Sequence, residues 1–300
     1  MYFYKAYGLN ISSEFRLPPL MEGGNGKDLL IKKAKLHPPL EFDETTIFRH
    51  NIEAFFAQNG QDLFIHWKGM ATLQASNGNT LLVEPEDEFG EELLCMYIIS
   101  EALGMILFQR GIFLLHGSAV MIGNKALVFV GAPGAGKSTT VAAFAKAGYV
   151  VLADDMVAIT VSDDKISVIP GYPQIKIWPS AIVGLEFIVA ETKRIHEKTK
   201  KRVIRNKNGF PDKAVPLSTI YLLHESPDQD EQVSQSLQSH IALTKYFPIP
   251  SQLLEGERQQ NHFNQIKNIL EKIDIKNLFN PKSFEILKNT VKRISVEYLT

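Results

Sequence analysis

The sequence predicts an α/β protein with a β-rich N-terminal region, and two observations support this. Residues 126–155 contain an apolar β-branched run, a glycine-rich turn, an alanine-rich segment ending at glycine, and a second apolar run. Strand, loop, helix and strand in that order form one unit of an α/β fold. Residues 1–85 contain short β-branched or aromatic runs separated by Gly-, Pro- and Asn-rich clusters, which is typical of strands and turns. We therefore expect a β-rich region over residues 1–85 and an α/β domain over residues 86–300.

The composition is that of an ordinary soluble protein. The chain has 300 residues, of which 45% are hydrophobic and 22% charged, and its net charge is −1. This charge balance does not favour nucleic acid or an anionic membrane as a partner. The single cysteine, Cys95, lies in an apolar segment, so we expect a buried thiol and a reducing compartment. The N-terminus lacks the features of a signal peptide, and we expect a cytoplasmic protein.

The elements expected before the glycine-rich turn are strands and one long helix. The N-terminal strands are expected at residues 2–7, 29–34, 45–48, 63–67 and 80–83. This region either supports the rest of the chain or offers a sheet edge to an extended peptide. The apolar run 89–110 predicts a buried helix, since it is short for a membrane span and contains Ser100 and Glu101. Acidic residues 86–88 suit the N-terminus of that helix.

A phosphate-binding loop is predicted where the first apolar run of the α/β unit ends. Gly131, Gly136, Lys137 and Ser138 fit the pattern G-x-x-x-x-G-K-S/T between an expected strand, 126–130, and an expected helix, 139–147. Glycines allow backbone N–H groups to surround phosphate oxygens, the lysine reaches the β- and γ-phosphates, and the serine hydroxyl binds Mg²⁺. The candidate nucleotide-binding residues are Gly131, Ala132, Pro133, Gly134, Ala135, Gly136, Lys137, Ser138 and Thr139.

Two adjacent carboxylates, Asp154 and Asp155, follow the second strand of this unit, expected at residues 149–153. At the carboxyl end of a strand beside the phosphate loop, an acid either binds Mg²⁺ or deprotonates an incoming hydroxyl. Neighbouring residues at a strand end point in different directions, so the pair can divide these tasks. The alternative is that they cap a turn. The predicted metal ligands are Ser138, Asp154 and Asp155.

Further candidates flank this unit. His116 follows a strand expected at residues 112–115 and precedes a second at 119–122, where an imidazole could orient one of the aspartates or serve only as a structural residue. Lys176 lies on a strand expected at residues 174–178, either near phosphate or simply exposed. Residues 191–207 include eight Lys or Arg. They form either a solvated surface or a lid whose Lys201, Arg202 or Arg205 closes on the γ-phosphate or on a peptide carboxylate.

The remaining sequence predicts a hairpin, a strand and two helices. The hairpin is expected at residues 157–161 and 166–169, and the strand at residues 217–223. Residues 225–240 are rich in Ser, Gln and Asp and are expected to form a loop. Amphipathic helices are expected at residues 252–270 and 281–293.

These motifs resemble one known family. His116, the loop Gly131–Ser138 and the pair Asp154–Asp155 follow one another as in the catalytic domain of bacterial HPr kinase/phosphorylase, whose fold is PEP carboxykinase-like. The stretch Leu115–Pro179, with LHGSAV, GAPGAGKST, LADD and PGYPQIKIWP, is still more similar to the HPr-kinase homologues of lasso-peptide and related peptide-modifying systems. The resemblance covers the loop region well and the rest of the chain loosely.

The resemblance implies an activity and also its limits. It implies that Lys137 and Ser138 bind phosphate and Mg²⁺, that Asp155 or Asp154 is the catalytic base, that His116 assists, and that an arginine such as Arg202 or Arg205 acts in catalysis. Three departures stand against a full match. The N-terminal region does not resemble that of HPr kinase, the segment used for dephosphorylation is not found, and Pro173–Lys176 offers no second acidic Mg²⁺ ligand.

The sequence therefore predicts an ATP- and Mg²⁺-dependent kinase. We expect it to transfer the γ-phosphoryl group to a serine hydroxyl of a peptide or protein, with a ribosomal precursor peptide as the preferred candidate. The alternatives are a kinase of a small hydroxylated metabolite such as free serine, and a nucleotide-binding regulatory protein without catalysis. Two acids and a histidine favour an enzyme, because a protein that only binds nucleotide needs no base. Whether the chain forms a homo-oligomer is left open.

Overall fold

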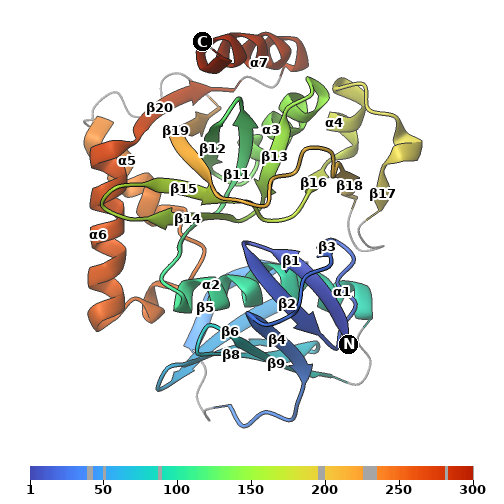
Figure 1. The fold of residues 1–300 in the computed structure, drawn as a ribbon, viewed down its shortest axis with the longest axis vertical. Helices are drawn as coiled ribbons and strands as arrows, with labels where there is room; N and C mark the ends of the chain where they lie inside the picture. The colour runs from blue at the N-terminus through green and yellow to red at the C-terminus, as the bar shows by residue number, and fades with distance from the viewer. Residues whose placement is uncertain are drawn as a thin grey trace. The chain divides into compact units, whose positions relative to one another are not determined.

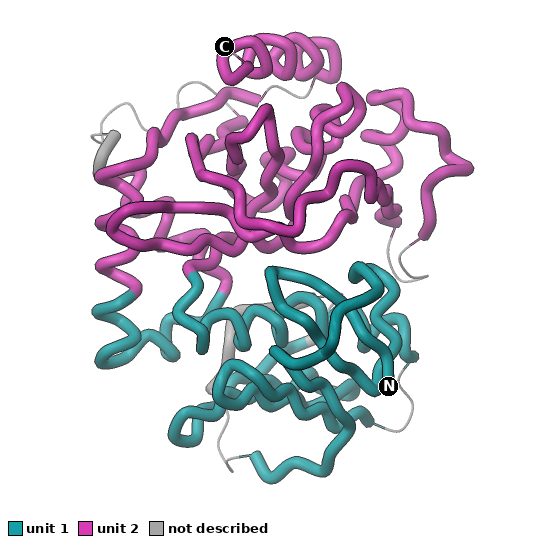
Figure 2. The backbone as a smooth tube through the Cα atoms, viewed as in Figure 1, with its two compact units in different colours: residues 1–112, 249–261 teal, residues 113–248, 262–300 magenta. Residues whose placement is uncertain are grey.

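The computed structural model describes residues 1–38, 43–49, 52–86, 90–194, 200–225, 235–280 and 283–299. The chain divides into two compact units, shown in Figure 2. Unit 1 comprises Met1–Ile112 and Ile249–Asn261, and unit 2 comprises Phe113–Pro248 and His262–Thr300. The sequence-based boundary after residue 85 thus differs from the boundary of the compact units. The helical run after residue 85 is grouped with the β-rich region.

Unit 1 contains a nine-stranded sheet in the order β3-β1-β2-β4-β9-β8-β7-β6-β5. Its strands are β1 Tyr2–Ala6, β2 Leu9–Ser13, β3 Met21–Glu22, β4 Leu29–Lys33, β5 Asp43–Arg49, β6 Ile52–Asn59, β7 Asp62–Trp67, β8 Ala71–Ser76 and β9 Thr80–Pro85. Strands β5 to β9 form an antiparallel meander. Buried and half-buried residues alternate along β8, so one face of the sheet packs against the core and the other is partly exposed.

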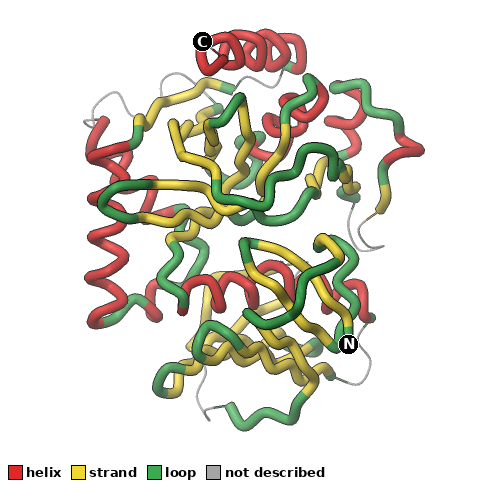
Figure 3. The backbone as a smooth tube through the Cα atoms, in the orientation of Figure 1, coloured by secondary structure: helices red, strands yellow, loops and turns green. Residues whose placement is uncertain are grey.

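The helical part of unit 1 covers this sheet. It runs without a break through α1 Glu91–Tyr97, a π-helical turn Ile98–Ala102 and α2 Leu103–Gln109 (Figure 3). Tyr97 packs on Trp67 of β7 with ring centroids 4.5 Å apart, and Cys95 is buried as predicted. Within the described residues, no helix is long and apolar enough to cross a membrane. The predicted single helix from residue 89 is therefore interrupted by one wider turn.

Unit 2 is built on a mixed eight-stranded sheet (Figure 1). The order β10-β14-β15-β19-β12-β11-β13 is extended by β20, which pairs with β19. Its strands are β10 Phe113–Leu115, β11 Gly117–Ile122, β12 Lys125–Gly131, β13 Val150–Asp154, β14 Val157–Val161, β15 Ile166–Ile169, β19 Val215–His224 and β20 Asp274–Phe279. A separate three-stranded sheet joins β16 Gln174–Ile177, β18 Arg202–Arg205 and β17 Lys193–Arg194.

Helices cover both faces of the central strands. On β12, Leu127 and Phe129 face a core shared with α3 Lys137–Lys146 and α7 Phe284–Leu299. Val128 and Val130 alternate with them and face a second core, which includes α5 Gln235–Lys245 and α6 Gly256–Lys272. Because β12 is buried on both faces, it is a continuous apolar run, which is why the sequence predicts it clearly.

Several sequence-based expectations need correction. Residues 225–240 were expected to form a loop, but α5 begins at Gln235, and residues 226–234 lie outside the described ones. Strand β20 and the N-terminal strands β2, β3, β6 and β8 were not expected. Polar residues interrupt the apolar pattern in β20, where the sequence reads DIKNLF, so pairing with β19 rather than composition makes it a strand. The hairpin β14–β15 and the helices α3 and α6 are confirmed to within a few residues, and α7 extends six residues beyond its predicted end at residue 293.

Candidate functional site

The predicted phosphate loop connects β12 to α3. Gly134 has φ of 90° and Gly136 has φ of 94°, a left-handed conformation that residues with a side chain rarely adopt. Gly136 is also the N-cap of α3 and provides no side-chain cap, so backbone N–H groups of the first helical turn stay open to an anion. Ala132, Pro133 and Gly134 are exposed, and Ser138 and Thr139 are half-buried. The loop therefore has the backbone geometry that phosphate binding requires.

Neighbouring strands hold this loop closely. A Cβ on Gly131 would lie 2.9 Å from the carbonyl oxygen of Leu223 on β19. Asn280, which follows β20, donates from Nδ2 to the carbonyl oxygen of Ala135 at 3.0 Å and leaves no room for a Cβ on Gly136. The backbone N–H of Asn280 in turn donates to the carbonyl oxygen of His224 at 2.9 Å. Asn280 thus connects the end of β20 to the loop.

Lys137, the lysine of the loop, is 9% exposed. Its Nζ donates to the carbonyl oxygens of Gly131 at 2.8 Å and Ala132 at 3.2 Å. Burial lowers the pKa of the Lys137 ammonium, while the charges of Asp155 and Asp154 raise it. Its two acceptors are neutral carbonyls, so a phosphate oxygen is a stronger partner for the same cation.

The order of three strands brings the loop and the acidic pair to one edge of the sheet. β11 lies between β12 and β13 and is antiparallel to both, so β12 and β13 run in the same direction (Figure 1). Gly117 pairs with Val130 and Ser118 pairs with Asp154. The start of β11 therefore lies beside the carboxyl ends of β12 and β13, where ligands bind in open α/β sheets.

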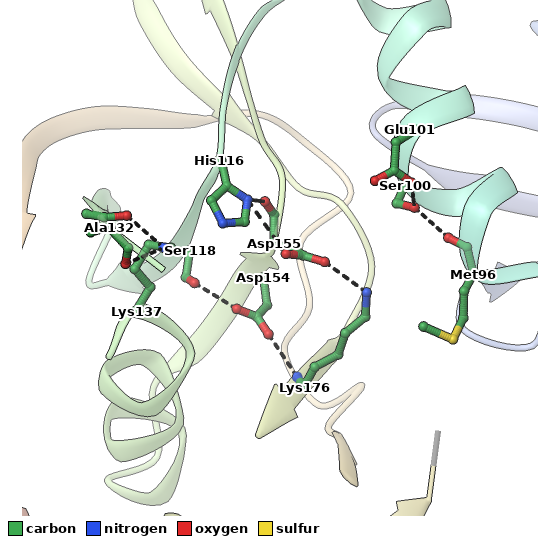
Figure 4. Close-up of polar contacts among 11 residues, drawn as sticks. Met96, Ser100, Glu101, His116, Ser118, Ala132, Lys137, Asp154, Asp155 and Lys176 are labelled. Atoms are coloured by element: carbon green, nitrogen blue, oxygen red, sulfur yellow. Dashed lines mark hydrogen bonds and ion pairs between the residues drawn. The ribbon is translucent and has the colours of Figure 1, made fainter. Parts of the chain in front are cut away.

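Asp154 is buried and fully hydrogen-bonded. One carboxylate oxygen accepts from the Ser118 hydroxyl at 2.7 Å, and the other accepts from the backbone N–H of Lys176 at 2.8 Å (Figure 4). The side chain of Ser138 also donates to it. Burial and the neighbouring Asp155 charge raise the pKa of Asp154, and these hydrogen bonds lower it in part. The side chain is fixed in place, but its ionisation in this buried position costs free energy.

Asp155 has an unusual backbone and two cationic or potentially cationic neighbours. Its φ is 84°, a left-handed conformation in which Asp and Asn are tolerated best. Oδ2 lies 3.0 Å from Nζ of Lys176, and Oδ1 lies 3.7 Å from Nδ1 of His116. The same Nδ1 is 2.9 Å from the carbonyl oxygen of Asp155. A carbonyl only accepts, so Nδ1 carries the hydrogen, and His116 holds the strained turn.

Lys176 joins the two acids. Its side chain is 7% exposed and forms the ion pair with Asp155, while its backbone N–H binds Asp154. Of the two sequence interpretations of Lys176, simple exposure is therefore wrong. Contact with phosphate stays a prediction. Breaking a buried pair leaves an uncompensated charge, so this contact orients Asp155 strongly.

The donor set is compatible with one Mg²⁺ that is also held by nucleotide phosphates. Among the described residues, no group of three or more His, Cys, Asp and Glu is arranged to hold a metal alone. Mg²⁺ uses one or two carboxylates with substrate phosphates and water. Ser138 already contacts Asp154, and the charge repulsion between Asp154 and Asp155 would be relieved by a cation. Asp154 and Ser138 therefore fit as its protein ligands.

The predicted lid is only partly described. Residues 195–199 lie outside the described part of the chain. The guanidinium of Arg202 donates to Thr192, with 2.7 Å from Nη2 to the carbonyl oxygen, and to the carbonyl oxygen of Val189 at 3.4 Å. Arg205 is exposed at the end of β18, and Lys201 lies over the ring of Trp178. The structure thus gives Arg202 a local structural partner, and a role at phosphate for either arginine stays a prediction.

Two residues of the site received no role from sequence. Ser118 was visible only as the residue that follows His116 and Gly117, and nothing in the sequence reveals its pairing with Asp154. Asn280 lies 144 positions beyond Gly136, as their numbers in the sequence show. Its approach to the loop depends on β20, a strand that the sequence did not predict. No local signal could have identified Asn280.

Comparison with known proteins gives little beyond this geometry. The chain matches no model of a protein family, and no curated protein matches it. Among solved structures it is similar to the HPr(Ser) kinase/phosphatase from Coxiella burnetii, with 14% sequence identity and a TM-score of 0.25. The match covers 41% of this chain and 66% of that protein, just under two thirds of its length.

Proposed function

We propose that this protein is an ATP- and Mg²⁺-dependent phosphotransferase that phosphorylates a serine hydroxyl of a peptide or protein. The observation that carries the proposal is the convergence of a glycine-rich loop, a buried lysine and two aspartates at one sheet edge. Phosphoryl transfer depends mainly on positioning and charge neutralisation, and this edge offers both.

The roles follow from the contacts. Free backbone N–H groups of the loop and of the first turn of α3 hold the phosphates, and Lys137 exchanges its loop carbonyls for phosphate oxygens. Asp154 and Ser138 would hold Mg²⁺, which would neutralise charge on the phosphates. Asp155, less buried and oriented by Lys176 and His116, accepts the proton of the attacking hydroxyl. Arg202 or Arg205 remains a candidate for stabilising the transferred group.

Two classes of acceptor are candidates. A ribosomal precursor peptide, as in lasso-peptide systems, follows only from the sequence resemblance, while a cytoplasmic location follows from the single cysteine and the N-terminal sequence. A small hydroxylated metabolite such as free serine is the second candidate, because nothing at the acidic pair itself selects a large substrate.

The test is incubation of the full chain with γ-labelled ATP and Mg²⁺ and with either a serine-containing peptide or free serine. We expect label on the peptide. Label on free serine alone would select the metabolite kinase. Tight ATP binding without transfer to any acceptor would contradict the proposal and leave a regulatory nucleotide-binding protein.

A further inference from the structure

Exposed apolar side chains gather in one short stretch of unit 2. They are Trp178, Val183, Ile188 and Val189, with 51%, 74%, 58% and 55% of each residue exposed. The stretch contains α4 Pro179–Gly184 and the 3₁₀ turn Val189–Glu191. Large apolar side chains that stay exposed together mark interaction sites in soluble proteins.

The three-stranded sheet β16–β18–β17 connects the beginning and the end of this stretch. Ile177, next to Trp178, pairs with Arg202 on β18. Arg202 also pairs with Arg194 and donates to the carbonyl oxygen of Val189. Trp178 and Val189 are therefore linked through one strand.

The surroundings of this surface are basic. The described residues among 178–207 include seven Lys or Arg and two Glu, in a chain whose net charge is −1. Lys193, Arg194 and Lys200 are exposed, and Nζ of Lys201 lies 5.4 Å from the ring centroid of Trp178. One of these two glutamates, Glu186, is already paired with Lys288. A partner that fits this surface is acidic and carries apolar side chains.

The surface begins two residues from Lys176, whose side chain contacts the acidic pair. Along β16, Ile175 and Ile177 face the core, so Lys176 faces the opposite side, where its Nζ contacts Asp155. Trp178 is extended, with φ of −76° and ψ of 152°, so it continues the side of Lys176. A chain bound over Trp178 would thus lie close to the proposed base.

We propose that the basic–apolar surface, defined as Trp178, Val183, Ile188, Val189, Lys193 and Arg194, docks an acidic peptide segment with interspersed apolar residues beside the acceptor serine. This inference rests on the proposed function and adds a substrate class to it. Nucleic acid fits less well, because single strands need several stacking aromatic side chains and the surface offers only Trp178.

The binding experiment uses three fluorescein-labelled dodecapeptides, each with one serine. The first alternates Glu with Leu, the second alternates Lys with Leu, and the third alternates Glu with Gly, and in each peptide the single serine replaces one Leu or Gly. Fluorescence anisotropy with the full chain should give an affinity for the first at least tenfold above that for the others. This affinity should fall as NaCl is raised, since salt screens exposed charges. Equal affinity for the three peptides, or preference for the Lys peptide, would overturn the proposal.

Matched variants locate the binding site. Val183→Ser and Lys193→Glu should each weaken binding of the Glu–Leu peptide at least fivefold. The controls are Val296→Ser, at a valine on α7 that is 66% exposed, and Lys292→Glu, at an exposed lysine on the same helix. They should leave binding unchanged. If the α7 variants weaken binding as much as the first pair, the surface is not the docking site.

Tryptophan quenching gives an independent readout. The chain has two tryptophans, of which Trp67 is fully buried and Trp178 is half exposed. Acrylamide should therefore quench mainly Trp178, and the Glu–Leu peptide should protect it. Unchanged quenching at saturating peptide would mean that the peptide binds elsewhere.

The failure of this inference is distinguishable from failure of the proposed function. Peptide binding that depends on Val183 and Lys193 would support the surface even if ATP did not bind, while the kinase proposal would fail. Transfer of label without preference for the acidic peptide would overturn the surface and keep the kinase. Displacement of the peptide by single-stranded RNA or phosphatidylserine vesicles at lower concentration than unlabelled peptide would assign the surface to those ligands instead. A dimer that Val183→Ser dissociates would assign it to a second copy of the chain.

Discussion

The two units differ most in the charge that they bury. Among the described residues, the buried lysine and aspartate side chains are Lys137, Asp154 and Lys176, and all lie in unit 2. The buried polar residues of unit 1 in the same set are only serines: Ser12, Ser13 and Ser100. Both units otherwise have apolar cores of large aliphatic and aromatic residues.

This difference indicates what each region is for. A buried serine is satisfied by one hydrogen bond, as Ser100 is by the carbonyl oxygen of Met96 (Figure 4). A buried charge costs several kcal/mol in desolvation, and a pair of apolar residues would often be as stable. Burial of Lys137, Asp154 and Lys176 therefore does not favour folding, and a chemical role explains it better than stability does. Perturbed and buried ionisable groups concentrate at functional sites for this reason.

The largest effect is expected from removing the two groups that the proposed function places at the reacting atoms. Lys137→Ala removes the cation proposed to stabilise charge on the transferred phosphate, and Asp155→Asn removes the proposed base. Each should lower the rate of label transfer by about 100-fold or more, as measured with γ-labelled ATP.

Asp155→Asn tests catalysis separately from folding. Asparagine tolerates the left-handed backbone at this position, so circular dichroism and ATP binding should resemble those of the unaltered protein. An active Asp155→Asn protein would remove this residue as the base.

In unit 1, a core substitution should lower stability and leave ATP binding unchanged. Ile65 on β7 is fully buried, and Ile65→Ala should lower the free energy of unfolding by about 2–5 kcal/mol, because it leaves a cavity. Urea denaturation measures this loss. ATP affinity of the folded protein should not change, since the candidate nucleotide-binding residues all belong to unit 2. A large fall in ATP affinity would show that the units are not separable in this way.

A smaller effect is expected from removing Asn280, a neutral side chain that holds the glycine-rich loop through a hydrogen bond. Asn280→Ala removes the hydrogen bond to Ala135, which is worth about 1 kcal/mol, and should weaken ATP binding roughly fivefold. Isothermal titration calorimetry measures the change. The control is Asn277→Ala on β20, where the exposed side chain accepts from His224 instead and ATP affinity should be unchanged. Equal effects at both positions would point to β20 as a whole rather than to the loop contact.

The smallest effect is a change in how stability depends on pH. Burial and Asp155 raise the pKa of Asp154, so the folded state favours its protonated form. The stability that this group contributes is fully present below its ordinary pKa of 3.8 and is lost as pH rises through the raised value. In Asp154→Asn, the amide can donate to Ser118 and accept from Lys176 without a charge. The unfolding temperature of the variant should therefore rise relative to the unaltered protein as pH increases from 4 to 8, in scanning calorimetry without Mg²⁺.

If the difference in unfolding temperature between these proteins stayed constant with pH, Asp154 would titrate at its ordinary pKa. Asp154 would then no longer support the contrast between the buried charges of unit 2 and the apolar core of unit 1.

Most of the correct predictions came from patterns within short stretches of the sequence. The phosphate loop, α3 and β13 lie within thirty residues, and glycine spacing, helix propensity and apolar runs identify them without tertiary information. The acidic pair followed from its position at a strand end. These predictions needed only neighbours in the sequence.

Contacts between distant segments could not be predicted. The pairing of Ser118 with Asp154, the ion pair of Lys176 with Asp155 and the support from Asn280 depend on strand order. The helix α5 was missed because its sequence, QSLQSHIALTK, is weakly apolar and begins within a Ser- and Gln-rich stretch. Tertiary packing decides such segments.

The position of β11 separates two tasks in this site. The loop belongs to β12, while the acidic pair belongs to β13 and is held by Lys176 of β16. In the proposed kinase, substitutions on β13, β16 and the segments after them would act on the acceptor side of the site without altering β12, the strand that precedes the glycine-rich loop. The acceptor side and the phosphate-donor side could then change independently.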